Sequence, residues 1–193
     1  MASHLKSADE HAALLDLIRK TDEHISGITL PADQRSQLAS GCLHIALEHQ
    51  AAIALLYSSE LFGSAFAFLR VLSESLVRGL WLLNCATDAE LEKFKKGRIG
   101  KTFAELIEEI EGKIGIQGGV LSRFKDIAWN AMNGFTHTGF IQVTRRHTPG
   151  IVQANYPEDE IVWLLQAAGK LGEIAAAQLI AMSQTVKNAS TSS

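Results

Sequence analysis

Apolar residues recur along most of the chain at the three- and four-residue spacing of α-helices. Residues 140–157 are instead rich in β-branched side chains, which predicts a short hairpin or an irregular loop. No alternation of strands and helices is found, so the pattern favours an all-α fold. We expect a bundle of about five to six helices with a long buried central helix. Its six longer segments are about 7–25, 32–58, 60–85, 102–115, 120–137 and 157–185. A short helix opened by a capping box at Thr87 and Glu90 comes between the third and fourth of them.

The length and composition of the chain predict a single domain. A chain of 193 residues with 47% hydrophobic content can bury one sizeable core, so residues 1–193 are expected to form a single domain, with 188–193 as a disordered polar tail. Cys42 and Cys85 lack the spacing of metal ligands, which predicts core residues in a reducing compartment. The first residues contain no continuous apolar run, which favours a cytoplasmic location.

The central helix carries an unusual stripe of charge. Within the apolar segment 66–83, Arg70, Glu74 and Arg78 follow one another at four-residue intervals and therefore share one face. Three charges also argue against a membrane span here. Because an unpaired interior charge is costly, Glu74 should bridge the two arginines inside the bundle, which leaves one positive charge over.

Two explanations remain open for that excess charge. His44 and Glu48 share a face of the preceding helix, and Glu48 could neutralise the second arginine. Alternatively the site stays cationic and binds a phosphate or carboxylate, for which arginine provides bidentate geometry. His137 lies among glycine and hydroxyl residues at a helix end, where its ring can turn toward a cleft. We therefore list His137, Arg70 and Arg78 as candidate catalytic residues and Glu74, Glu48 and His44 as candidate ligand-binding residues.

The sequence lacks the motifs of several common metal-binding, nucleotide-binding and catalytic sites. The sequence contains no Glu-x-x-His pair of the kind that builds metal sites in helical bundles, and His44 with Glu48 would make half a site at most. Phosphate-loop, dinucleotide, zinc-protease and hydrolase-elbow motifs are also missing. We expect no metal and no cofactor. With a net charge of −3, any binding to nucleic acid would have to be local, and the basic segment 93–101 is interpreted as an exposed connector.

Three features resemble bacterial all-α proteins of the HEPN-like and abortive-infection type, together with related uncharacterised families. They are the helix FLRVLSESLVRGLWL, the helix WNAMNGFTHTG that ends in a histidine, and an alanine-rich last helix, which together span about 38–182. Active members of that group are similar in cleaving RNA with an arginine placed shortly before a histidine, in a dimer cleft. This chain has no arginine four to six residues before His137, and the nearest upstream one is Arg123. The resemblance therefore bears on the fold more than on the activity.

Two functions of different classes follow. The first is a homodimeric cytoplasmic protein whose Arg/Glu/His site binds RNA or a nucleotide-like anion in a defence or regulatory role. Its enzymatic form would use His137 as acid or base and the arginines to stabilise phosphate charge. The second is a non-catalytic dimeric interaction module in which the polar network sets helix register. Both functions include a homodimer, because the central and last helices are more apolar than one small bundle needs. Neither function includes a membrane.

Overall fold

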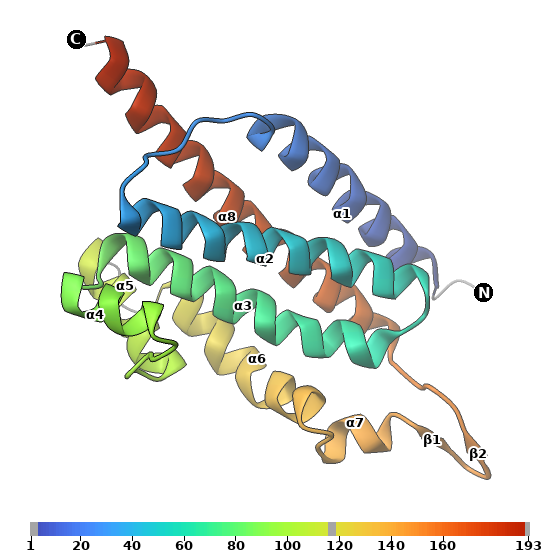
Figure 1. Ribbon diagram of the computed structural model, residues 1–193. Coiled ribbons are helices and arrows are strands. Elements are labelled where there is room, and N and C mark those ends of the chain that lie inside the picture. Colours follow the sequence, from blue (N-terminus) through green and yellow to red (C-terminus); the bar gives the residue numbers. More distant parts are fainter. Residues whose placement is uncertain (1–3, 116–118, 192–193) are drawn as a thin grey trace.

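The chain is an all-α bundle, as the hydrophobic pattern predicted. The computed structural model describes residues 4–115 and 119–191, which form eight helices and one small antiparallel hairpin (Figure 1). The elements are α1 (His4–Ile25), α2 (Gln34–Ser58), α3 (Phe62–Asn84), α4 (Asp88–Lys95), α5 (Phe103–Ile114), α6 (Val120–Thr136), α7 (Phe140–Thr144), β1 (His147–Thr148), β2 (Ile151–Val152) and α8 (Glu158–Thr191).

The predicted central helix is α3. It packs against α2, α5, α6 and α8, while α1 lies across α8 and α2 on the other side of the bundle (Figure 1). Because neighbours cover α3 on several sides, its apolar residues surround most of its circumference, and Leu69, Leu72, Leu76 and Leu82 are fully buried. The charged stripe on α3 faces α5 and α6, and residues of these two helices lie beside it.

Small residues bring the long helices close together. A Cβ atom at Gly79 of α3 would lie 2.8 Å from Cγ of Leu43, so α2 and α3 approach where a larger residue would not fit. Two turns further along α2, Gln50 is 1% exposed, and its side-chain amide donates to the Ala168 carbonyl of α8 at 3.2 Å. A Cβ at Gly172 would lie 2.2 Å from that same amide group. Glycines thus set the spacing of both helix pairs.

Capping residues begin α2, α4 and α5. Asp33 caps α2 by accepting from the backbone N–H of Ser36. The capping box predicted at Thr87 and Glu90 is confirmed and begins α4. A second box, Thr102 with Glu105, begins α5. The second box lies directly after the connector between α4 and α5 and fixes its C-terminal end.

Two segments differ from the prediction. Residues 140–157 contain the expected hairpin, and α7 precedes it as an additional single turn of helix. The last helix continues to Thr191, so its expected end near Thr185 and the disordered tail from 188 are wrong for residues up to 191. Residues 186–191 contain no glycine or proline to stop the helix. Residues 192–193 lie outside the described part of the chain.

Both cysteines pack against the core as free thiols. Burial raises the pKa of the Cys42 thiol, although the nearby Arg78 charge opposes the shift, and burial also raises the pKa of Cys85. Both thiols are therefore protonated at neutral pH and of low reactivity. Among the described residues, no helix combines the length and apolar character required to cross a bilayer.

Candidate anion site between α3, α5 and α6

The charged stripe of α3 forms one ion cluster. Glu74 Oε1 accepts from Arg70 Nε at 2.9 Å, and Glu74 Oε2 accepts from Arg78 Nη2 at 2.8 Å. The predicted bridge between the two arginines is therefore confirmed. The side chains of Arg70, Glu74 and Arg78 are 20%, 17% and 39% exposed, so the cluster opens to solvent on the Arg78 side rather than lying sealed inside the bundle.

His137 is the neighbour that α6 contributes. Arg70 Nη1 lies 2.8 Å from His137 Nε2. Because a guanidinium group has donors only and remains protonated, the Nε2 atom must be the acceptor in this contact. The ring is then the neutral tautomer that carries its proton on Nδ1. In this arrangement His137 orients Arg70, and its Nε2 lone pair is already used.

The backbone at the end of α6 places His137 toward α3. His137 caps α6 with its backbone N–H on the Asn133 carbonyl, and Thr138 adopts a positive φ of 54°, which is unusual for a β-branched residue. A Cβ at Gly139 would lie 2.9 Å from the Cα of Gly134, so the chain reverses through a contact that only glycine allows. Strained backbone of this kind tends to occur at functional sites.

A cavity of about 230 Å³ opens beside the cluster. The Trp129 ring forms part of its wall, stacked on Phe103 with ring centroids 4.4 Å apart and planes 7° apart. The guanidinium carbon of Arg70 lies 5.1 Å from the centre of the Trp129 ring, within cation–π distance. The cavity thus combines a flat aromatic surface with guanidinium groups. Its lining consists of Arg70, Glu74, Arg78, Ile99, Lys101, Phe103, Leu106 and Trp129.

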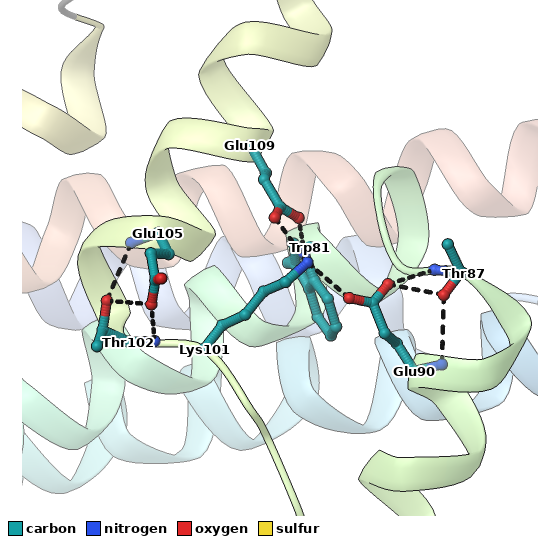
Figure 2. Close-up of polar contacts among 7 residues, drawn as sticks. All are labelled: Trp81, Thr87, Glu90, Lys101, Thr102, Glu105 and Glu109. Carbon is teal, nitrogen blue, oxygen red and sulfur yellow. Dashed lines mark hydrogen bonds and ion pairs between the residues drawn. The ribbon is translucent and has the colours of Figure 1, made fainter.

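Lys101 contributes a third positive charge to this lining. Its Nζ atom lies 2.6 Å from a carboxylate oxygen of Glu90 and 2.6 Å from one of Glu109 (Figure 2). The other Glu109 oxygen accepts from Trp81 Nε1 at 2.7 Å, and Lys101 Nζ lies 5.0 Å from the Trp81 ring centre. Lys101 immediately precedes the capping box of α5, so the helix start holds it in place.

Glu90 connects this network to α4. One of its oxygens binds Lys101, and the other accepts from the backbone N–H and the hydroxyl of Thr87, both at 2.8 Å (Figure 2). The hydrogen bond from Lys101, followed by that from the Thr87 backbone, lowers the pKa of Glu90 to about 2. Lys101 in turn has a raised pKa, first because of its hydrogen bond to Glu109 and then because of Glu90. The network is therefore charged throughout the neutral range.

The arginine pair beside the cavity keeps an excess of positive charge. Arg70 and Arg78 share one carboxylate, that of Glu74. The charge of Lys101 is instead balanced by the two acids that bind it. Each guanidinium group has five N–H donors, and Glu74 accepts from only one nitrogen of each arginine. Donors therefore remain on both arginines for an anion, next to an aromatic surface.

Glu48 and His44 do not belong to this site, which corrects the expectation that they neighbour the arginines. Both are exposed on α2 and line a separate cavity of about 220 Å³ beside Thr21 and Asp22 of α1. The reason is helical geometry, since His44 follows Leu43 by one residue and so lies about 100° around α2 from the face that contacts α3. The excess charge of the stripe is thus not neutralised by Glu48.

Lys101, Trp129 and Glu109 were not expected in the site. Lys101 is the last cation of the basic segment 93–101, whose other cations are exposed in the last turn of α4 or on the connector that follows it. Only its position just before Thr102 distinguishes Lys101 from them. Trp129 lies on the half-buried face of an amphipathic helix, where a core role is the simplest expectation. No described group of three or more His, Cys, Asp and Glu side chains is arranged to hold a metal ion.

Comparison with known proteins gives a family but no activity. A family model described as a family of unknown function, DUF6988, matches residues 43–192. The chain belongs to this family. The DUF6988 match includes α3, α5 and α6, so every residue that lines the cavity lies inside it, whereas α1 lies outside. No curated protein and no solved structure matches the chain.

Proposed function

We propose that the cavity between α3, α5 and α6 binds a phosphate-bearing anion of the nucleotide kind, either a free nucleotide or single-stranded RNA. The observation that carries this function is the pair Arg70 and Arg78 on one shared carboxylate, at a cavity walled by Trp129. Arginine offers donors to phosphate oxygens, and the aromatic wall of Trp129 and Phe103 offers an apolar surface against which a base can pack. Together they match the two ends of a nucleotide.

The size of the cavity indicates how such a ligand would lie. A volume of about 230 Å³ is below the roughly 300–1,000 Å³ of sites that enclose a whole small molecule. It accommodates a phosphate group with part of its nucleoside, and the remainder of the ligand would extend past Arg78, the most exposed member of the cluster. An open mouth of this kind accepts either a mononucleotide or a longer chain.

Binding is favoured over catalysis because of the state of His137. Its Nε2 atom accepts from Arg70, so it is not available to take a proton from a ligand unless that contact breaks. The histidine then serves to position an arginine that contacts phosphate. The resemblance to HEPN-like proteins would place such binding in defence or regulation, and the two free thiols support the expected cytoplasmic setting.

Isothermal titration calorimetry tests this function with three probes: inorganic phosphate, AMP and a five-nucleotide single-stranded RNA, on protein first stripped of nucleic acid. AMP and RNA should bind more tightly than phosphate, because only they carry a base that can pack against the aromatic wall of Trp129 and Phe103. Arg78→Gln should weaken binding at least tenfold, since a charge-assisted hydrogen bond contributes about 1.5–3 kcal/mol. RNA that binds much more tightly than AMP would identify RNA as the ligand, and similar affinities would identify a nucleotide.

Arg98→Gln is the matched control, because it removes the same charge from the exposed connector next to the cavity. It should change affinity less than threefold. Equal losses in the two variants would mean that only general electrostatics attracts the probes. That outcome, or the absence of binding at millimolar ligand, would leave the ion cluster as the register-setting network of the second hypothesis.

A further inference from the structure

α7 and the β1–β2 hairpin, residues 140–152, form an arm that projects from one end of the bundle (Figure 1). Its polar side chains contact the bundle. Arg145 pairs with Glu160 of α8, and a Cβ at Gly63 of α3 would lie 2.8 Å from Arg146 Nη2 and 3.6 Å from Gln142 Nε2. An ordinary surface segment would direct such polar groups to water.

The apolar side chains of the arm face solvent instead. Phe140 is 83% exposed and Val152 is 78% exposed, and the other large apolar residues of the arm are also open to solvent. With Ile127 of α6, the arm supplies half of the twelve large apolar residues that are exposed in the described chain. The six are Ile127, Phe140, Ile141, Val143, Ile151 and Val152. Exposed apolar side chains gathered on one arm in this way are typical of an interaction surface.

A hollow of about 620 Å³ lies at the base of the arm, between α6, α7 and α8. Its walls are mostly apolar and include Met132, Phe135 and Trp163, and Phe140 stands at its edge. Charges of both signs, Arg145 with Asp159 and Glu160, also line it. The arm thus forms a projecting apolar ridge, and the hollow beside it is a recess large enough for a side chain of such a ridge. We call the arm and the hollow together the patch.

We propose that this patch is the interface of a symmetric homodimer, in which Phe140 of each copy enters the hollow of the other. A two-fold interface places the same patch on both subunits, so the patch must be complementary to itself. A ridge beside a recess, with charges of both signs at the recess, meets this condition. Six exposed apolar side chains, each burying on the order of 100 Å², supply most of the roughly 800 Å² per partner of a stable interface.

Other occupants fit the patch less well. A small apolar molecule could fill the hollow, but it would leave Val143, Ile151 and Val152 in water. A membrane surface would favour an excess of cations around the apolar face, whereas here Arg145 is paired with Glu160 and Asp159 adds a further negative charge. The helices expected to dimerise because of their apolar character, α3 and α8, bury those side chains in the core of the same chain.

Sedimentation velocity of the full chain from about 1 to 100 μM, the range of a moderate association, tests the interface. The unmodified protein should dimerise, and Phe140→Ser and Val152→Ser should each weaken dimerisation at least tenfold. Both side chains are largely exposed, so the variants should keep the fold, which circular dichroism would verify. The matched control is Leu55→Ser, a large apolar residue that is 69% exposed on α2, and it should leave dimerisation unchanged.

Three results would overturn the interface. One is a monomer throughout the concentration range, and another is a dimer that both arm variants leave intact. The third is arm-dependent co-sedimentation of monomeric protein with phosphatidylcholine vesicles, which would identify the patch as a membrane contact. None of these outcomes bears on the anion site, because that cavity is lined by different residues.

Discussion

Glu74 is the residue on which the candidate site depends. It is 17% exposed and holds two guanidinium groups, one on each carboxylate oxygen. A carboxamide of the same shape accepts through one oxygen only and carries no charge, so the two arginines would face each other uncompensated. Glu74 therefore determines how much uncompensated positive charge faces the cavity.

We therefore expect Glu74→Gln to lower the free energy of unfolding by about 1.5–3 kcal/mol, the range for charge-assisted hydrogen bonds. This is less than for a fully buried pair, because Arg78 is reached by solvent. Urea denaturation would measure it, with Glu108→Gln, an exposed acid of α5, as the control. A change below about 0.5 kcal/mol in Glu74→Gln would show that water replaces the carboxylate without cost.

At the scale of elements, Glu90 joins the start of α4 to the connector before α5. It accepts from Thr87 within the capping box and binds Lys101 with its other oxygen. The pKa of Glu90, about 2, lies below its ordinary value of 4.5. A carboxyl with a depressed pKa stabilises the fold above its ordinary pKa, and that stabilisation is lost as the pH falls through the lowered value.

Glu90→Gln should therefore cost about 1–2 kcal/mol at pH 7, and its difference from the unmodified protein should shrink as the pH falls from about 4.5 to 2. Glutamine still closes a capping box, so the change isolates the ion pair with Lys101. Thermal melts across this pH range would measure the difference. Glu92→Gln, in an exposed pair with Lys95 on the same helix, should show a smaller effect. A difference that stays constant with pH would contradict the assigned role.

For the whole molecule, the contact between α2 and α8 joins parts of the chain far apart in sequence. The Gln50 side chain is buried against Gly172 and donates to the Ala168 carbonyl. Because Gln50 has little room to move, any side chain at position 172 must displace it or separate the helices. The close packing of α2 against α8 therefore requires a glycine at position 172.

Gly172→Ala should lower the free energy of unfolding by about 1–3 kcal/mol through overpacking, although alanine is the better helix former. Gly169→Ala is the matched control on the same helix, since its Cβ would meet only Leu17 and Leu14 at 3.6 and 3.9 Å. It should be neutral or stabilising by up to about 1 kcal/mol. Guanidinium denaturation would compare the two, and a stabilising Gly172→Ala would mean that Gln50 repacks freely.

The long helices and the charged cluster could be predicted from local features of the sequence. Periodicity predicted the long helices because burying one apolar face is a local property of the chain, and the Thr87 box predicted the start of α4. Four-residue spacing brought Arg70, Glu74 and Arg78 together because helix geometry alone makes them neighbours. The resemblance to HEPN-like proteins and the homodimer stay predictions.

The surroundings of that cluster could not be predicted in the same way, because they depend on contacts between helices that are distant in sequence. The spacing of His44 and Glu48 shows that they share a face of α2, but not which face α3 covers, and the packing of Leu43 against Gly79 turns them away. Lys101 and Trp129 reach the cavity because α5 and α6 fold back onto α3, a contact between distant segments that no local pattern records. Spacing along a helix is set by the backbone, whereas neighbours across helices depend on how whole faces pack.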